Sequence, residues 1–565
     1  MWKAKPYNKE IEKELLENGK GKLLARLLSQ RNIPLEKIDS FLSASYEELS
    51  HPHDLKGIKE GVEIFTNVAL NKGKVVVFGD YDVDGIFSSF MLKELCTIFH
   101  LKCKAFLPSR FEHGYGLNEK SLKAFKEFIK DDMPELVIFT DCGSNNNDEM
   151  KEIKDAGVDK IIIIDHHLVD ENKISKSADV LINWHLTEGH DEMCSCGLVY
   201  QFIRGIRWVT KKVDPIEFLT YAAVGTVADV SPLIGNNRII VKEGLKKYAI
   251  SHVASYGFHA LIKECRIYSD NIFQNDVAFK IAPRVNSTGR MATPDIAYRL
   301  LLEETQSTAE LIAMELTDLN KNRKKEQQKI VDEAVKMIEE DPDAYKYGIF
   351  VFKEDWNVGI IGIVASKLVD TFSKPVLIMG ENEGIIKGSG RSFKGINLKE
   401  ILDDCSYMFI KYGGHPLAAG ATLNSDYVLK ANDIFNETCK EYYSKNDIKI
   451  DEEKHYDADL KISSINPKIT KALINTLYPY CSQYNPEPIF KVSNVVLSEV
   501  ELREEPTYKL LSFRVEKDGK KNDMKMKTFV VKYGTEISGS TADVYFAFNQ
   551  DNVKELRVVD IELKK

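Results

Sequence analysis

Short apolar runs alternate with longer amphipathic segments between residues 74 and about 240. The runs read KVVVF, KAFLP, ELVIFT and KIIIID, and they start at residues 74, 104, 135 and 160. This alternation predicts βαβ units and a parallel sheet covered on both faces by helices. Residues 1–73 show mainly the spacing of helices, with turns at NIP and HPHD, so we expect a helical segment ahead of the sheet.

Three further segments follow the predicted sheet. Residues 306–340 predict one long helix that Pro342 ends, with a basic middle from Lys321 to Lys325. A basic run of this kind is typical of a solvated helix face. Beyond residues 477–490 the chain changes to short alternating runs, which predict a small antiparallel barrel. These runs read YKLLSFRVEK, KMKTFVVKYG, ADVYFAFNQD and KELRVVDIEL.

Composition indicates a soluble chain of several domains. Its 565 residues are 43% hydrophobic and 29% charged, which suits three or four globular domains of roughly 100 to 200 residues. The N-terminus is too charged for a signal peptide, and no apolar run approaches the roughly 18 residues of a membrane span. We therefore expect no membrane association and a cytoplasmic location. The net charge of -9 gives no overall sign of nucleic-acid binding, so a basic groove would have to be local.

The nine cysteines lack regular spacing, which argues for reduced thiols and against a disulfide framework. One segment offers a possible zinc site, because imidazoles and thiols occur close together in WHLTEGHDEMCSCG. The alternative is a surface loop that leads into a helix near Cys196, and the spacing favours that alternative. The four candidate ligands are His185, His190, Cys194 and Cys196.

Acidic residues and histidines follow three of the predicted strands. Asp80, Asp82 and Asp84 come within five residues after the first run. One of them is expected to cap the next helix, but three carboxylates so close together raise each other's pKa unless a cation lies among them. Asp141 follows the ELVIFT run, and the KIIIID run ends in Asp165, which His166 and His167 follow.

The carboxyl ends of parallel strands meet at one edge of a sheet, where ligands of such folds bind. A further carboxylate, Asp229, follows an apolar helical stretch that could lie across this edge. Carboxylates combined with imidazole favour Mn²⁺, Mg²⁺ or Zn²⁺. The sequence therefore predicts a metal site at the carboxyl end of the sheet.

Several motifs carry a resemblance to a known family. DYDVDG, TDCGSN, DHH and GTVADVSPL resemble the four ordered motifs of the DHH phosphoesterase superfamily. Within it, the chain resembles the RecJ family of single-strand-specific 5′ to 3′ DNA exonucleases, in order from about residue 40 to the C-terminal region. The motifs that carry this second likeness are PSRFEHGYGLN, APRVNSTGRM, LTDLNKNRKKEQ, NVGIIGIVASKL, KGSGRS and GGHPLAAG.

The resemblance implies an α/β fold with a defined domain plan. An N-terminal helical segment (1–73) would precede a parallel-sheet DHH catalytic domain (74–305). A connecting long helix (306–345) would form a wall of the substrate cleft and lead to a second α/β domain, the DHH-associated substrate-binding domain (346–450). The C-terminal β-barrel (451–565) would be an OB-fold-like nucleic-acid-binding domain.

The resemblance also implies site residues and two Mn²⁺ or Mg²⁺ ions. Asp141 would touch both ions, and His167 would contact the scissile phosphate or assist departure of the 3′-oxygen. Asp80 and Asp165 would orient the metal ligands without binding the metal ions themselves. The expected metal ligands are Asp82, Asp84, Asp141, His166 and Asp229. The expected contacts to substrate are Arg110, Arg284, Asn286, Arg290, Ser389, Arg391, Gly413, Gly414 and His415, of which Ser389 and Arg391 with Arg284 or Arg290 would hold the 5′ end.

Two details of the likeness leave alternatives open. Many relatives have a histidine where this chain has Phe78, which would leave the site of Asp82 and Asp141 short of a ligand unless Asp80 takes its place. The barrel would bind bases by stacking, or it would serve only as a structural cap. The aromatic residues available for stacking are Tyr484, Phe490, Tyr508 and Tyr545.

The expected function is that of a metal-dependent 5′ to 3′ exodeoxyribonuclease acting on single-stranded DNA in repair and recombination. A helicase and a single-strand-binding protein are possible partners, and the family suggests a monomer. Three alternatives stand beside it: a family II pyrophosphatase, a DHH phosphodiesterase on short RNA or cyclic dinucleotides, and a non-catalytic Cdc45-like scaffold. The pyrophosphatase is far shorter and lacks the barrel, and the scaffold has lost the metal ligands that this chain keeps.

Overall fold

The computed structural model describes residues 2–31, 33–114, 116–393, 395–446, 454–481, 484–505, 508–529, 533–549 and 552–564. The chain separates into two compact units. The first contains residues 1–108, 115–282 and 452–565, and the second contains residues 109–114 and 283–451. The predicted parallel sheet and the barrel both belong to the first unit.

The first unit contains a five-stranded parallel sheet in the order β3-β2-β4-β5-β6. Each predicted strand is present, and a short fifth strand extends the sheet beyond β5. Because the chain runs from β2 outward to β3 and then returns to β4 on the other side, the topological switch point lies between β2 and β4, where such folds bind ligands. The strands are β2 (Val75–Phe78), β3 (Cys103–Phe106), β4 (Leu136–Thr140), β5 (Lys160–Ile164) and β6 (Val180–Ile182).

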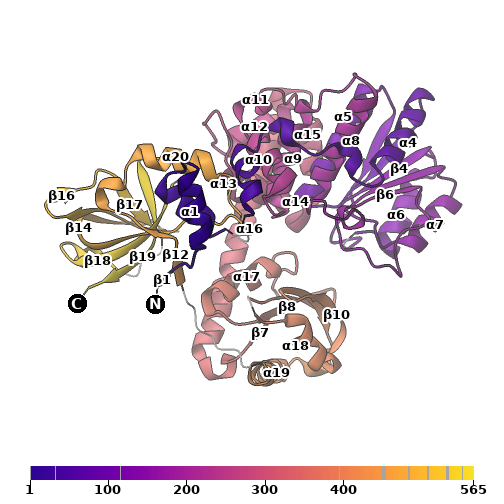
Figure 1. Ribbon diagram of the computed structural model, residues 1–565. Helices are drawn as coiled ribbons and strands as arrows, with labels where there is room; N and C mark the ends of the chain where they lie inside the picture. The colour runs from indigo at the N-terminus through magenta and orange to yellow at the C-terminus, as the bar shows by residue number, and fades with distance from the viewer. Residues whose placement is uncertain are drawn as a thin grey trace. The chain divides into compact units, whose positions relative to one another are not determined.

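Helices cover both faces of this sheet (Figure 1). On one face, α6 (Glu119–Ile129) and α7 (Asn147–Asp155) pack on alternate strand residues that include Phe78 and Phe139. On the other face lie α4 (Ile58–Leu70), α5 (Val83–Ile98) and α8 (Ser195–Val209), with α9 (Ile216–Ala228) packed on α5 and α8. The near-continuous apolar strands follow from this burial on two sides.

Shorter helices complete this part of the unit. They are α10 (Gly235–Gly244), α11 (Lys247–Ile250), α12 (Tyr256–Glu264) and α13 (Gln274–Asp276). A π-helical turn, η5 (Val277–Ile281), then leads into α14 (Ala282–Met291).

The C-terminal strands form a closed barrel, as predicted, but one of its strand pairs, β17 with β19, is parallel and not antiparallel. Around it the order is β14-β18-β19-β17-β15, and β15 pairs back to β14. A helix, α20 (Pro467–Leu477), precedes the barrel. The barrel strands are β14 (Phe490–Glu505), β15 (Tyr508–Lys517), β17 (Lys525–Thr528), β18 (Thr541–Phe548) and β19 (Glu555–Leu563).

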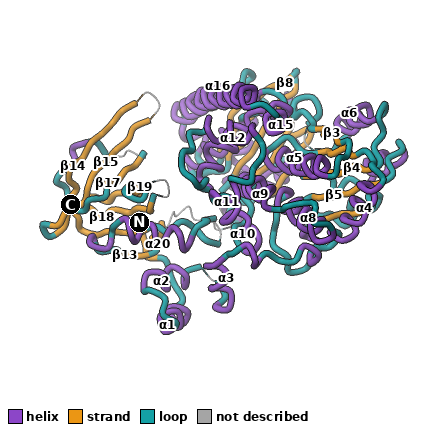
Figure 2. Tube along the Cα trace, turned by 90° about the horizontal axis from the view of Figure 1, so that it is seen from above, coloured by secondary structure: helices purple, strands orange, loops and turns teal. Residues whose placement is uncertain are grey.

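The first helices of the chain belong to the same hydrophobic core as the barrel, which the sequence did not predict. Leu27 and Leu28 of α2 (Lys22–Ser29) share that core with barrel residues such as Phe513. In addition, β1 (Trp2–Ala4) pairs in parallel with β12 (Lys454–Tyr456). Leu15 of α1 (Lys9–Glu17) belongs to that core as well. In Figure 2, α2 lies next to the barrel and α1 lies beyond α2.

The second unit is built on the long predicted helix and a mixed sheet. The helix, α16 (Gln306–Glu340), follows α15 (Asp295–Leu302), and the sheet order is β10-β11-β9-β8-β7. One face of the sheet packs on α16 and α17 (Ile361–Phe372), and the other on α18 (Leu398–Asp404) and α19 (Ala431–Lys445). The strands are β7 (Ile349–Phe352), β8 (Val376–Asn382), β9 (Ile385–Arg391), β10 (Phe409–His415) and β11 (Ala418–Leu423).

Helix length and apolarity bear on the expected absence of a membrane span. Within the ranges given above, no helix is both long enough and apolar enough to cross a bilayer.

Candidate functional site

The N-terminus of α5 positions the first group of carboxylates. Asp82 is the cap of this helix, since its Oδ1 accepts hydrogen bonds from the backbone N–H groups of Asp84 (2.9 Å) and Gly85 (3.2 Å). One of the three aspartates was predicted to be a cap, and the structure identifies it. Asp80, Asp82 and Asp141 each offer one carboxylate oxygen, and these oxygens lie within 4.8 Å of one another.

Asp84 is held by the N-terminus of another helix. Its two oxygens accept the backbone N–H groups of Ser195 (2.7 Å) and Cys196 (2.8 Å) at the start of α8. The positive end of a helix stabilises a carboxylate there. Close packing by α9 supports the arrangement, because a methyl group on Gly225 would overlap the sulfur of Cys196 and lie 3.0 Å from Asp84 Oδ1.

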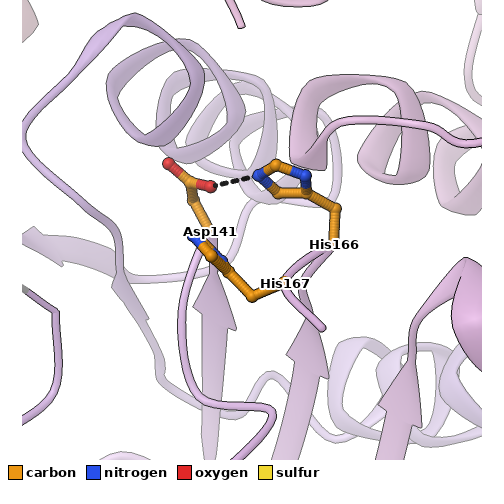
Figure 3. Close-up of side chains that lie close together, drawn as sticks. All are labelled: Asp141, His166 and His167. Atoms are coloured by element: carbon orange, nitrogen blue, oxygen red, sulfur yellow. Dashed lines mark ion pairs between the residues drawn. The ribbon is translucent and has the colours of Figure 1, made fainter. Parts of the chain in front are cut away.

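A second group forms around His166. Its Nε2 lies 3.3 Å from Asp141 Oδ1, 3.8 Å from Asp229 Oδ1 and 3.9 Å from Asp84 Oδ2. Figure 3 shows the imidazole of His166 directed at the carboxylate of Asp141. Asp229 directly follows α9, and its other oxygen accepts the hydroxyl of Ser231. Three strands and two helices thus bring these side chains together.

His167 is fixed by Asp165. The Nδ1 of His167 lies 2.7 Å from Asp165 Oδ1, which also accepts the backbone N–H groups of both histidines. Burial lowers the pKa of His167, but the hydrogen bond and charge of Asp165 outweigh it and raise that pKa to about 9. Burial would raise the pKa of Asp165, yet the same pairing holds it well below its usual range. This geometry matches the orienting role expected for Asp165.

The buried carboxylates repel one another. Burial and then the charge of Asp82 raise the pKa of Asp80 to about 8, and burial and then Asp84 raise that of Asp229 to about 7. Asp80 is 1% exposed, and its Oδ1 has no hydrogen-bond partner among the residues that the structure describes.

This donor set fits divalent cations. Oxygen and imidazole donors suit Mn²⁺ and Mg²⁺, a cation would offset the repulsion, and the unpartnered oxygen of Asp80 is available as a ligand. Asp141 belongs to the group with Asp80 and Asp82 and also to a group with His166 and His167. It is therefore placed to bridge two ions. Asp141 also has a φ of +62°, a strained backbone conformation of the kind that clusters at functional sites.

Phe78 does not face this site. Its side chain is fully buried, with its ring centroid 5.1 to 5.3 Å from those of Phe106, Phe125 and Phe139. The position is therefore part of the apolar core beneath α6. The neighbouring Asp80 is the residue whose carboxylate lies beside Asp82 and Asp141, which supports the alternative raised for the missing histidine.

Ser195 is a further residue of the site that was not predicted from the sequence. Its hydroxyl lies 3.3 Å from Asp141 Oδ1 while its N–H binds Asp84, so one residue positions two expected metal ligands. The available signal was the run of small residues CSCG directly before an apolar helix.

The four residues of the possible zinc site have other partners. Cys196 Sγ lies 3.3 Å from the carbonyl oxygen of Asp84, and Cys194 Sγ lies 3.7 Å from the hydroxyl of Thr226. The ring of His185 stacks on Trp184. Across the described ranges, the groups of possible metal ligands include neither these cysteines nor His185 or His190.

In the second unit, several expected substrate contacts surround the start of α17. Arg290 donates to the carbonyl of Gly359 (3.2 Å). A methyl group on Gly362 would lie 3.0 Å from Ser389 Oγ and 3.3 Å from Arg391 Nη2. Burial and then the charge of Arg110 lower the pKa of Arg391. We call this set, Arg110, Arg290, Ser389 and Arg391, the α17 cluster.

The other expected contacts of this unit fall in two places. His415 and Gly413 share a sheet face with members of the α17 cluster, and Gly414 lies between them on β10. The cross-strand pairs form the rows His415, Ala418, Arg391 and Gly413, Gly420, Ser389. Arg284 instead turns to α16, where its Nε donates to Thr317 Oγ1 (2.9 Å). Asn286 is half-buried on α14 between Arg284 and Arg290.

Two of the four barrel aromatics proposed for base stacking are core residues. Phe490 is fully buried beside Phe548, and Tyr545 is 1% exposed beneath the ring of Trp2, with centroids 4.4 Å apart. Tyr484 is half-buried, and the side chain of Tyr508 lies outside the described residues. The stacking prediction was wrong for Phe490 and Tyr545. Phe490 belongs to the barrel's hydrophobic core, and Tyr545 is covered by Trp2 from the start of the chain, a contact that no local pattern predicts.

Two family profiles match the chain. The DHH family, N-terminal domain, matches residues 74–226, and the DHHA1 domain matches residues 344–441. The first covers the sheet and most of the carboxylates around it, and the second covers the sheet of the other unit.

Named relatives and solved structures agree with these profiles. The chain is 33% identical over 490 residues to the single-stranded-DNA-specific exonuclease RecJ of Bacillus subtilis, covering 85% of this chain and 59% of that protein. It thus spans less than two thirds of that relative. A crystal structure of RecJ with Mn²⁺ from Thermus thermophilus has a TM-score of 0.79 at 23% identity, over 100% of this chain and 79% of that one. A structure of exonuclease RecJ bound to manganese has a TM-score of 0.59 at 28% identity, over 69% of this chain and 95% of that one.

Proposed function

We propose that this chain is a metal-dependent exonuclease of the RecJ branch of the DHH family, which degrades single-stranded DNA from the 5′ end and releases 5′-mononucleotides. One observation carries the proposal most directly. Asp141 stands in two groups of metal-binding side chains at the switch point of the parallel sheet. A site of this kind suits hydrolysis of a phosphodiester by two cations.

Two Mn²⁺ or Mg²⁺ ions would share Asp141. One ion would be held by Asp82 with Asp80, and the other by Asp84, His166 and Asp229. The manganese in a RecJ structure 28% identical to this chain supports that choice of metal. When bound, the ions supply charge neutralisation at the scissile phosphate and favour attack by water.

The protein's own groups prepare the site for this chemistry. The N-terminus of α8 fixes the orientation of Asp84 by two N–H donors. Asp165 accepts from the Nδ1 of His167 and so fixes the orientation of its imidazole. With a pKa of about 9, His167 carries a proton at neutral pH. It can therefore donate that proton to a phosphate oxygen or to the departing 3′-oxygen.

In the second unit, the α17 cluster is proposed to receive the 5′ end. The first N–H groups of a helix attract phosphate, and Gly362 in the first turn of α17 lies beside Ser389 and Arg391. A guanidinium adds charge-assisted bonds of the kind that favour phosphate. Gly413, Gly414 and His415 would extend this surface along the sheet.

The barrel is proposed to have the OB-fold. The proposal is supported by a closed barrel of five strands in which the pairs are antiparallel except for the parallel pair β17–β19. OB-folds bind single strands in a basic groove with aromatic side chains. Many barrel cations have acidic partners, such as Lys525 with Glu501 and Lys527 with Glu555. Strand binding by the barrel is therefore proposed as secondary to that of the α17 cluster.

We further propose a role in DNA repair and recombination in the cytoplasm, as a monomer that a helicase or a single-strand-binding protein supplies with substrate. These features follow from the likeness to the RecJ family.

The test is product analysis with end-labelled DNA. A single strand labelled at its 5′ end, incubated with Mn²⁺, should release labelled mononucleotide from the first cut, while a 3′ label should remain on long fragments. A DNA duplex with blunt ends should not be hydrolysed. Release from the 3′ end would overturn the proposed polarity. Exclusive cleavage of pyrophosphate, short RNA or cyclic dinucleotides would overturn the substrate class.

A further inference from the structure

The buried stripe of α16 is interrupted by polar residues at its middle. Before and after this point the buried positions are apolar, for example Leu316 and Ile330. Between them lie Asn320, 4% exposed, and Arg323, 7% exposed. The sequence favoured a solvated face for this basic stretch, and Arg323 does not fit that description.

Arg323 is a buried cation bound to neutral groups. Its Nε and Nη2 donate to Asn320 Oδ1 (3.1 and 2.9 Å), and its Nη1 donates to Gln327 Oε1 (2.9 Å). Within the described part of the chain no carboxylate pairs with it, and burial alone accounts for its lowered pKa. A buried charge without a counter-ion is costly. A structural role alone therefore does not explain why a charge occupies this position.

Lys324 follows Arg323 directly, and Arg284 of α14 contacts α16 about two turns earlier, at Thr317. Lys324 is exposed, and its pKa is lowered by burial of part of its side chain and then by the charges of Arg323 and Arg284. Arg284 is half-buried and reaches α16 through Thr317. The solvent exposure of the three cations increases from the buried guanidinium of Arg323, through half-buried Arg284, to the exposed amine of Lys324. An anion would approach these cations from the side of Lys324.

This group of three cations differs from the α17 cluster. Arg284 and Arg290 turn to different partners, Thr317 and the carbonyl of Gly359. The sequence left open which of these two arginines accompanies Ser389 and Arg391. The contacts separate them, with Arg290 in the α17 cluster and Arg284 on α16.

We propose that Arg323, Arg284 and Lys324 form a second phosphate site, which binds an internal phosphodiester of the single strand independently of its 5′ end. The inference rests on the proposed function, because the anion is taken to be part of a DNA strand. Arg323 is the anchoring residue, held in place by Asn320 and Gln327, and Lys324 closes the site from the solvent side. The strand would then be held at two points along α14.

The experiment measures binding without hydrolysis. The full-length protein in EDTA is titrated with a 20-mer oligothymidylate, 5′-phosphorylated or 5′-hydroxyl, labelled at the 3′ end for anisotropy. The titration is repeated over a range of salt concentrations. The variants are Arg323→Gln, Arg323→Lys and Lys324→Gln, with Arg391→Gln for the 5′ end. Lys336→Gln is the matched control, since Lys336 is exposed farther along α16 and pairs with Glu340.

Arg323→Gln should weaken binding of both oligonucleotides equally, by about tenfold or more, and lower the slope of log K against log salt by about 0.7. Lys324→Gln should lower the slope similarly, whereas Arg391→Gln should affect mainly the phosphorylated strand. Arg323→Lys should restore the slope but not the full affinity, because it keeps the charge and loses the planar donors.

Two results have distinct meanings. If the unaltered protein fails to bind either strand, the proposed function fails. If it binds, but Lys324→Gln and Arg323→Gln keep its affinity and slope, the second phosphate site is overturned. Thermal unfolding identifies any misfolded Arg323 variant, and in that case the exposed Lys324→Gln decides the question alone.

Discussion

At the residue scale, the carboxyls of Asp80 and Asp229 make metal binding depend on pH. Their pKa values are about 8 and about 7 in the folded protein, against about 3.9 for an exposed aspartate. Between pH 4 and 8 the folded, metal-free protein therefore holds protons that the unfolded chain has released. The contribution of these two groups to the free energy of unfolding of the metal-free protein therefore falls as pH rises through that window.

Metal binding must displace these protons. The apparent affinity for Mn²⁺ should accordingly rise between pH 6 and 8, by up to about tenfold per pH unit for each proton released. Calorimetric titration at pH 6, 7 and 8 checks this, and two buffers of different ionisation enthalpy count the protons. An affinity that does not change over this range would show that the carboxyls are already ionised without metal.

Phe78 gives a second prediction at this scale. Phe78→His places a polar ring in a closed aromatic cluster. It should lower the free energy of unfolding by about 2 to 4 kcal/mol and leave Mn²⁺ affinity unchanged. Phe128→His is the control, since Phe128 touches the same cluster but is 39% exposed. This control should lower the free energy of unfolding by less. Tighter Mn²⁺ binding by Phe78→His would mean that this position reaches the metal.

The sequence was sufficient to predict which carboxylates and histidines lie close together, because apolar runs that stop at aspartates mark the ends of the strands. The sequence could not show which partner each carboxylate oxygen has. Asp80 lies beyond Phe78, the last residue of β2, in the turn before α5, so strand alternation does not predict where its carboxylate lies. Ser195, which binds Asp84, lies 111 residues away at the start of α8. Such long-range contacts leave no local pattern.

At the element scale, the packing of α9 on α8 maintains Asp84 and Asp229 in position. Gly225 allows this approach, because any side chain there meets Cys196 and Asp84. The predicted helix near Cys196 was confirmed as α8, and the long helix at 306–340 as α16. The use of the α8 N-terminus to hold Asp84, an expected metal ligand, followed only from the packed structure.

Gly225→Ala should therefore separate α9 from α8. We expect a loss of about 1 to 3 kcal/mol in stability together with weaker Mn²⁺ binding, as measured by denaturant unfolding and calorimetry. Gly61→Ala serves as control, because its methyl group would meet Phe202 at a milder 3.2 Å far from the carboxylates in the fold. It should leave Mn²⁺ affinity unchanged. Normal metal affinity in Gly225→Ala would refute the supporting role of this contact.

At the scale of the whole molecule, the first unit joins parts of the chain that the domain plan kept separate. The N-terminal helices share the barrel core, and Arg238 links both to α10, which packs on α9. Its guanidinium donates to the carbonyls of Phe41, Leu477, Tyr478 and Pro479. Removing the barrel from about residue 455 would expose this shared core, so truncation would not isolate the barrel's role in strand binding.

Arg238→Met tests this junction. Arg238 is 1% exposed, and its loss leaves four buried carbonyl groups without a donor, so unfolding should become easier by about 3 kcal/mol or more. Lys246→Met is the control, since Lys246 is exposed and pairs with Glu243 at the surface. It should change stability by less than about 0.5 kcal/mol. Equal unfolding free energies for the two variants would mean that Arg238 does not hold the junction.

The measurement that tests the central claim most directly is the initial rate of 5′-mononucleotide release from single-stranded DNA in Mn²⁺ by the unaltered protein and by Asp141→Asn. Asparagine tolerates the positive φ of residue 141 while removing the charge proposed to bridge both ions. The account predicts that the unaltered protein hydrolyses the strand and that the variant loses nearly all activity, yet unfolds normally and still binds the DNA. Hydrolysis by Asp141→Asn at the rate of the unaltered protein would contradict a two-metal centre at this sheet edge.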